Sequence, residues 1–166
     1  GQVVFILDIP TLVETNADEA HRNTDDASNL ALELAELQDR TPIAMVVDDS
    51  ITIRKASGNL LKRLGFEVST ARDGVEALAQ LHEQKPDIIL LDVEMPRMDG
   101  LEFLEAYMMD YPAEERAPVL VYSGKDLTEV QRDFLDKNVA GMVRKDDVSM
   151  DELSTIVKNI YQESTT

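Results

Sequence analysis

The stretch that decides the fold is IILLDVEMPRMDG, residues 88–100. It opens with the apolar run Ile88–Leu91, which follows Pro86 and precedes a turn rich in Pro and Gly. A short continuous apolar run between turn residues is typical of a strand buried on both faces of a parallel sheet. Asp92 comes directly after this run. Because ligands of open parallel sheets bind beyond the carboxyl ends of the strands, we expect Asp92 to lie where chemistry takes place.

Strand and helix patterns alternate on both sides of this stretch. The predicted strands cover residues 43–47, 66–71, 88–92, 118–122 and 139–143. The predicted helices cover residues 50–64, 74–84, 101–109, 127–137 and 150–161, with Gly65 ending the first and Asn138 closing the fourth in a left-handed conformation. Five strand–helix units with short connections predict an α/β fold, a five-stranded parallel sheet with helices on both faces.

Polar side chains follow four of these strands. They are Asp48 and Asp49 after the first, Asp92 after the third, Ser123 after the fourth and Lys145 after the fifth. Three carboxylates share a pocket in ionised form only when cations offset their charge. Lys145 supplies one positive charge, and a hard divalent cation supplies the rest, Mg²⁺ first and Mn²⁺ as the alternative. This composition predicts phosphoryl transfer, in which positioning and charge neutralisation carry the catalysis.

Taken together, these pieces resemble a known family. Residues 43–162 are similar to the CheY-like receiver domain of two-component response regulators. The matching pieces, each after a predicted strand, are Val46–Ser50, Leu90–Gly100, Tyr122–Gly124 and Lys145. The resemblance implies a flavodoxin-like (βα)5 fold with the strand order 2-1-3-4-5.

The resemblance also implies a role for each acidic residue. Asp92 would be the nucleophile that takes a phosphoryl group from a phosphohistidine on a histidine kinase or a histidine phosphotransfer domain. Mg²⁺ would be bound by Asp49 and Asp92 directly, by Asp48 through water, and by the backbone carbonyl of Glu94.

Two further groups would contact the phosphoryl group itself. Ser123 would be the switch hydroxyl that bonds it, and Lys145 would pair with it. An added dianion at the end of a strand makes new charge-assisted hydrogen bonds, which bias a loop that has two arrangements.

Two positions and one residue pair need separate interpretation. Met142 stands at the switch position where receivers carry Tyr or Phe, so the aromatic part of the usual switch is in question. Asp146 stands where Pro commonly follows the lysine through a cis bond, and a cis bond without proline costs about 2.5–4 kcal/mol, so we predict a trans bond between Lys145 and Asp146. A Glu94–Lys125 ion pair is our hypothesis for control of water access to the phosphoryl group.

The opening residues resemble a second family. Residues 1–13 are similar to the last strand and turn of the CheW-like domain that ends CheA-type chemotaxis kinases. We therefore expect the end of a CheW-like domain at 1–14, a linker with a short helix at 15–41, the receiver at 42–162 and a tail at 163–166. The implied parent is a hybrid CheA-type histidine kinase of which this chain is a part. Strand Val3–Leu7 would have bare edges, so we expect it to pair with another copy, giving a homodimer, or with a receiver edge.

Composition narrows the function classes. The net charge of −17 disfavours binding to nucleic acid and to anionic lipid. The absence of Cys excludes disulfides and thiolate metal sites and fits a cytoplasmic protein, located at chemosensory arrays if the parent is a CheA-type kinase. Two alternatives to a phospho-acceptor stay open: a degenerate receiver that acts as an interaction module without phosphorylation, and a phosphatase of the haloacid dehalogenase type. In the preferred interpretation the chain is an acceptor rather than a conventional enzyme.

Overall fold

The computed structural model describes residues 28–30, 40–124 and 126–165. The chain divides into two units, residues 1–40 and residues 41–166. In the first unit, residues 28–30 are helical and exposed. The predicted strand Val3–Leu7, the rest of the predicted linker helix and Lys125 lie outside the described residues.

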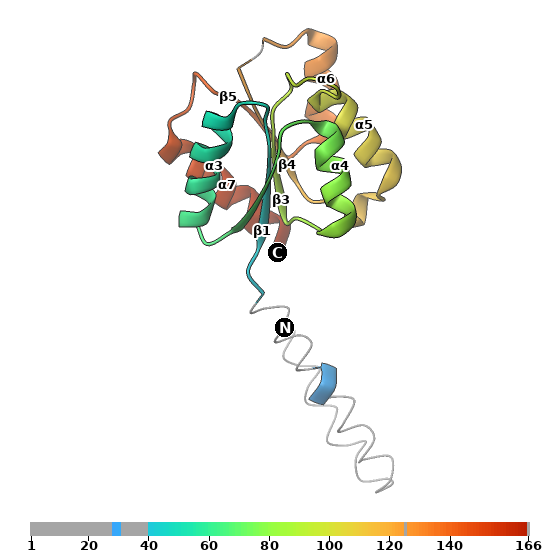
Figure 1. Ribbon diagram of the computed structural model, residues 1–166, viewed down its shortest axis with the longest axis vertical. Coiled ribbons are helices and arrows are strands. Elements are labelled where there is room, and N and C mark those ends of the chain that lie inside the picture. The colour runs from blue at the N-terminus through green and yellow to red at the C-terminus, as the bar shows by residue number, and fades with distance from the viewer. Residues whose placement is uncertain (1–27, 31–39, 125, 166) are drawn as a thin grey trace, which may run out of the picture. The chain divides into compact units, whose positions relative to one another are not determined.

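Five parallel strands form the sheet of the second unit (Figure 1). They are β1 (Ile43–Val47), β2 (Glu67–Ala71), β3 (Ile88–Leu91), β4 (Val119–Ser123) and β5 (Gly141–Arg144). Their order is β2-β1-β3-β4-β5, which confirms the order that the sequence resemblance implies. The strands all run in the same direction, so their carboxyl ends meet at one edge of the sheet.

Helices cover both faces of this sheet. They are α3 (Ile51–Arg63), α4 (Gly74–Glu83), α5 (Gly100–Asp110), α6 (Glu129–Asn138) and α7 (Met150–Thr165), with a 3₁₀ turn at Ala113–Glu115. In Figure 1, α3 and α7 lie on one side of the sheet, and α4, α5 and α6 lie on the other. None of the described helices combines the length and the apolar character that a membrane span requires.

The core consists of two apolar clusters, one on each face. Successive residues of a strand point to opposite faces, so the buried run Ile88–Leu91 serves both clusters. On one face Ile89 packs with Phe103 of α5 and Leu135 of α6. On the other, Leu90 packs with Leu153 of α7. Burial of each such side chain contributes about 1.5–3 kcal/mol, and this explains why the third strand reads as an uninterrupted apolar run.

The helices end within one residue of the sequence prediction except at two ends, the start of α6 and the end of α7. Helix α6 begins at Glu129 rather than at residue 127, because Thr128 caps it by accepting a hydrogen bond from the Gln131 amide. Asn138 does not adopt the predicted left-handed conformation: it stays helical and its side-chain amide donates to the Phe134 carbonyl at 2.7 Å, so the chain leaves the helix in extended form. Helix α7 continues to Thr165, so residues 163–165, expected as a tail, form its last turn.

Two backbone predictions are confirmed. Gly65 follows α3 with φ 99°, the left-handed conformation that ends a helix. No peptide bond within the described ranges is cis, so the bond between Lys145 and Asp146 is trans.

Candidate functional site

The sheet ladder places the predicted site residues at one edge. The Asp92 amide donates to the Val47 carbonyl at 2.8 Å, which extends the pairing of β3 with β1 by one residue. The Lys145 amide donates to the carbonyl of Ser123 at 3.0 Å, which extends the pairing of β5 with β4. Because the backbone of each residue is held in the ladder, the side chains project from fixed points beyond the strand ends.

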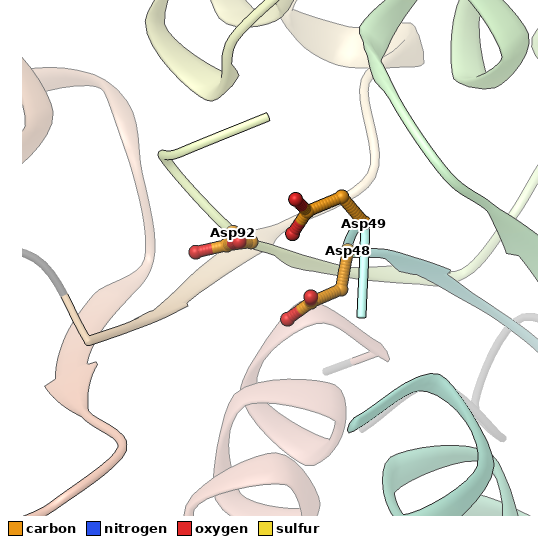
Figure 2. Close-up of side chains that lie close together, drawn as sticks. All are labelled: Asp48, Asp49 and Asp92. Atoms are coloured by element: carbon orange, nitrogen blue, oxygen red, sulfur yellow. The ribbon is translucent and has the colours of Figure 1, made fainter. Parts of the chain in front are cut away.

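Three carboxylates gather at this edge, as the sequence predicts. Figure 2 shows Asp48, Asp49 and Asp92 directed toward a common space, with one oxygen of each within 4.8 Å of the others. Asp48 and Asp92 are buried, at 2% and 5% exposure, whereas Asp49 is exposed. This acidic cluster therefore combines two charges held away from water with one at the solvent boundary.

Lys145 lies between two of these acids. Its Nζ is 2.7 Å from Asp48 Oδ2 and 3.6 Å from Asp92 Oδ1. Burial lowers the pKa of Lys145, but the hydrogen bond that its ammonium donates to Asp48 and the charges of Asp48 and Asp92 outweigh burial, so its pKa lies above the usual value. The ammonium is consequently a permanent cation at the centre of the site.

Asp92 has a strongly perturbed carboxyl group. Burial and then the charge of Asp48 raise its pKa to about 6, and Asp49 adds to the increase. Lys145 and a hydrogen bond from the Ser123 hydroxyl act in the opposite direction but do not cancel it. The site therefore holds more negative charge than its own lysine neutralises.

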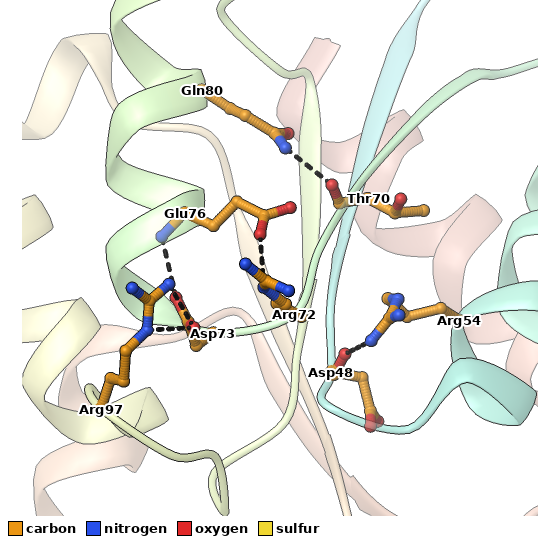
Figure 3. A network of polar contacts seen from close by, with 8 residues as sticks. All are labelled: Asp48, Arg54, Thr70, Arg72, Asp73, Glu76, Gln80 and Arg97. Carbon is orange, nitrogen blue, oxygen red and sulfur yellow. Dashed lines mark hydrogen bonds and ion pairs between the residues drawn. The ribbon is translucent and has the colours of Figure 1, made fainter.

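Asp48 is oriented by contacts on both of its oxygens. The Ser50 amide donates a hydrogen bond to Oδ1 at 2.9 Å, and the Lys145 ammonium donates one to Oδ2. In addition, the Arg54 guanidinium donates to the backbone carbonyl of Asp48 at 2.7 Å (Figure 3). The sequence analysis did not single out Arg54, since nothing in its local pattern indicates that it reaches back over the first turn of α3.

Glu94 and Met142 line two different cavities. Glu94 is exposed and lines an open depression of about 580 Å³ together with Asp49, Val93, Met95, Pro96 and Asp99. Met142 is paired with Val121 in the β4–β5 ladder and lines a second cavity, of about 520 Å³, that Ser123 also lines. The switch residues thus adjoin a cavity separate from the depression. Lys125, the expected partner of Glu94, lies outside the described residues, so that pair stays a prediction.

The acidic cluster fits a hard divalent cation. Its donors are carboxylate oxygens, the ligands that Mg²⁺ and Mn²⁺ prefer in proteins, and they are close enough together to share one ion. The raised pKa of Asp92 also favours a bound cation, because it shows that the positive groups of the chain do not compensate the negative charge around this carboxyl. Asp49 is exposed, so a hydrated ion can reach the cluster.

Two charged residues outside the predicted set also bear on this edge. Asp73 caps α4, and Arg97 in the loop after β3 forms an ion pair with it. An Asp-Gly pair before a helical pattern is a recognisable cap signal, so Asp73 could have been found from the sequence. Its pairing with Arg97 could not, because 24 residues separate the two.

Comparison with known proteins gives consistent results. Residues 44–158 match the response regulator receiver domain family. The chain is 44% identical over 82 residues to Protein PilG of Pseudomonas aeruginosa, a match that covers 49% of this chain and 60% of PilG. It is 47% identical over 83 residues to a protein-glutamate methylesterase/protein-glutamine glutaminase of Anaeromyxobacter dehalogenans, covering 50% of this chain and 23% of that protein. The chain therefore spans less than two thirds of either relative.

A solved structure shows a likeness over a larger share of the chain. Chemotaxis protein CheY4 of Vibrio cholerae is 31% identical, with a TM-score of 0.64 over 73% of this chain and 99% of CheY4. A CheY-like receiver domain from Methanospirillum hungatei, 23% identical with a TM-score of 0.68, shares the fold. With the strand order, the acidic edge and the family match over residues 44–158 in agreement, the chain belongs to the response regulator receiver domain family.

Proposed function

We propose that this chain is a phospho-acceptor in a two-component phosphorelay, and that Asp92 takes the phosphoryl group from a phosphohistidine of a histidine kinase or histidine phosphotransfer domain. The observation that carries the proposal is the environment of Asp92. A buried carboxyl with a pKa near 6 lies 3.6 Å from a lysine and shares a cluster with two further acids. Such strongly perturbed groups gather at functional sites.

The residues present account for the transfer step. An ionised Asp92 oxygen attacks phosphorus, the P–N bond to the donor imidazole breaks, and the imidazole leaves with the bonding electron pair and takes up a proton. Lys145 and the Ser123 hydroxyl lie beside Asp92 and supply positive charge and a hydrogen bond to the phosphoryl oxygens. Asp49, Asp92 and the Glu94 carbonyl, with Asp48 through water, would hold Mg²⁺, which would supply the charge neutralisation that phosphoryl transfer needs.

The cavity beside Ser123 supports a route from phosphorylation to output. Ser123 and Met142 lie on the adjacent strands β4 and β5 and line this cavity together. A Ser123 hydroxyl drawn toward the phosphoryl group leaves room that the flexible thioether of Met142 fills. The result is a changed surface around β5, which a partner protein reads.

The decisive experiment is incubation with acetyl phosphate and Mg²⁺. The wild-type chain is expected to form a hydroxylamine-sensitive acyl phosphate, detected by intact mass and mapped to Asp92. The adduct is expected to vanish in Asp92→Asn and to persist in Asp110→Asn, which removes an exposed aspartate at the end of α5. An unmodified wild-type chain would instead favour the phosphorylation-independent interaction module. Steady turnover of a phosphate ester would favour the haloacid dehalogenase alternative.

The identity of the surrounding protein is part of the same proposal. A CheA-type histidine kinase as parent, the CheW-like end at residues 1–14, a location at chemosensory arrays and a homodimer through Val3–Leu7 all stay predictions, because residues 1–27 lie outside the described ranges.

A further inference from the structure

A buried carboxylate outside the acidic cluster is held by an arginine from the loop that follows Asp92. In Figure 3, Arg97 reaches across to Asp73. The Arg97 Nε and Nη2 atoms lie 2.8 Å and 2.7 Å from the same oxygen, Asp73 Oδ2. The other oxygen, Oδ1, accepts the Glu76 amide at 2.9 Å and so caps α4. Both oxygens of Asp73 are thus engaged.

The burial of Asp73 distinguishes this ion pair from an ordinary surface pair. The Asp73 side chain is 2% exposed and that of Arg97 is 54% exposed. Exposed pairs contribute little because solvent screens them, whereas a buried carboxylate must keep its partners. Burial raises the pKa of Asp73, but the hydrogen bonds from the Glu76 amide and from Arg97 outweigh burial and hold the pKa below its usual value. The carboxylate is therefore a charged anchor for Arg97 at neutral pH.

The loop that Arg97 belongs to is strained and closely packed. Arg97 has φ 65°, a left-handed conformation that is unfavourable for a residue with a long side chain. The Met98 amide bonds the Pro96 carbonyl at 2.7 Å around it, and the Gly74 amide bonds the Met98 carbonyl at 3.1 Å. Such a conformation persists only where the surroundings hold it. The attachment points are the start of α4 and Asp73.

The same loop carries groups of the proposed site. It joins Asp92 to α5, and Glu94, whose carbonyl is a proposed metal ligand, lies three residues before Arg97. Its far end is fixed by the Gly100 amide, which bonds the Val93 carbonyl at 2.9 Å. Because these hydrogen bonds hold the loop, a shift of the backbone at Arg97 is transmitted to Glu94 and Asp92.

We propose that Arg97 and Asp73 are positioning residues, a clamp that holds the loop after β3 in the conformation that binds the divalent cation and presents Asp92 for phosphorylation. The clamp acts through the backbone, since neither side chain belongs to the acidic cluster. Its role in phosphoryl transfer rests on the proposed function, but its role in loop order and metal binding does not.

The test uses two variants that spare the local backbone. Arg97→Asn removes the guanidinium and installs a residue that tolerates the left-handed conformation, so loss of binding cannot be attributed to strain. Asp73→Asn removes the charge and keeps a good N-cap for α4. Arg72→Gln is the matched control, because it removes a positive charge next to Asp73 whose ion pair, at 3.1 Å, is with Glu76 of α4.

The primary measurement is Mg²⁺ affinity by calorimetry, without any phosphodonor. Loss of residues that orient metal ligands costs about 10–100-fold in affinity, and since the clamp acts through the backbone we expect the lower end, about tenfold, for each clamp variant. Arg72→Gln is expected to bind as the wild type does. The double variant is expected to lose no more than either single one, because both changes break one interaction. Arg97→Lys keeps a charge and is expected to recover part of the affinity.

A second measurement separates positioning from general stability. Hydrogen exchange of the Met98 and Gly100 amides in metal-free protein is expected to quicken in both clamp variants by more than the change in global stability, taken from urea denaturation of the same variants, accounts for. Wild-type Mg²⁺ affinity and unchanged exchange in Arg97→Asn would overturn the clamp. If the wild-type chain accepts no phosphoryl group but the clamp variants still lose Mg²⁺ affinity and loop protection, the proposed function fails and the clamp stands.

Discussion

The charge of Asp92 opposes folding when no divalent cation is bound. Its pKa is about 6 in the folded chain and 3.8 in an unperturbed chain, so the folded state holds the proton over a range in which the unfolded state has lost it. The free energy of unfolding therefore falls as pH rises from about 4 to about 6, and above that range the full penalty is present. At neutral pH a neutral side chain at this position is more favourable for stability.

The first prediction follows from the destabilising effect of the Asp92 charge. Asp92→Asn is expected to raise the free energy of unfolding at pH 7.5 in Mg²⁺-free buffer by about 2 kcal/mol, because it removes a buried charge beside Asp48. The gain is expected to fade by pH 4, where the wild-type carboxyl is largely protonated. Urea denaturation followed by circular dichroism measures both values. An equal gain at the two pH values would contradict the electrostatic origin.

Glu94 gives a second prediction at the residue scale. It is exposed at the rim of the depression beside Asp49, where water approaches the proposed acyl phosphate. Under the hypothesis that Glu94 restricts water, Glu94→Ala is expected to speed dephosphorylation severalfold, measured as loss of the intact-mass adduct after removal of acetyl phosphate. Glu114→Ala, an exposed glutamate on the 3₁₀ turn, is the control. The same lifetime in Glu94→Ala and wild type would end the hypothesis.

At the scale of the elements, the junction between the loop after β3 and α5 depends on one glycine. A Cβ on Gly100 would lie 2.4 Å from the Asp92 carbonyl oxygen and 2.9 Å from the Val93 Cα, both backbone atoms that cannot move aside. A Cβ on Gly58, within α3, would meet only the Val68 side chain, at an ordinary 3.6 Å. The two glycines therefore provide a matched pair.

This contrast gives the third prediction. Gly100→Ala is expected to lower the free energy of unfolding by about 1–3 kcal/mol, because overpacking displaces the backbone that carries Asp92. Gly58→Ala is expected to raise it by about 0.5–1 kcal/mol, because alanine is the better helix former and the space is available. Urea denaturation of both variants measures the values, and a free energy of unfolding that rises in Gly100→Ala as it does in Gly58→Ala would show that the close approach at Gly100 is relieved.

The elements also show how far the sequence alone leads. The central strands were predictable because burial on both faces leaves an unbroken apolar run, as at Ile88–Leu91. Asp48, Asp92 and Lys145 were predictable as neighbours because parallel strands end at one edge. Asn138 was predicted wrongly because its local propensity for a left-handed cap yields to the extended entry into β5. The contact of Arg97 with Asp73 was not predictable, since it depends on where two loops meet.

For the molecule as a whole, cation binding at the acidic cluster would be coupled to folding. The net charge of −17 repels itself, and any dissolved salt screens part of that repulsion. A cation bound at Asp48, Asp49 and Asp92 would raise the free energy of unfolding further, because a ligand that binds only the folded state stabilises it. Screening and site binding are separable by comparing salts.

The fourth prediction makes this comparison. Mg²⁺ at ten times its dissociation constant is expected to raise the free energy of unfolding by about 1.4 kcal/mol more than NaCl of the same ionic strength. Asp49→Asn is expected to lose this excess and to keep the response to NaCl. Urea denaturation in the two salts measures both. Equal responses of the wild-type chain to the two salts would contradict a cation site in the cluster.

The contact between Lys145 and Asp48 joins residues 97 positions apart, and β5, which precedes the lysine directly, is the last of the five strands of this sheet to be synthesised. A nascent chain still short of β5 can bring Asp48, Asp49 and Asp92 into proximity, but these acids have no ammonium among them and repel one another. Under the proposed function, a product truncated before β5 would lack the ammonium of the site and so would not divert phosphoryl groups from intact copies.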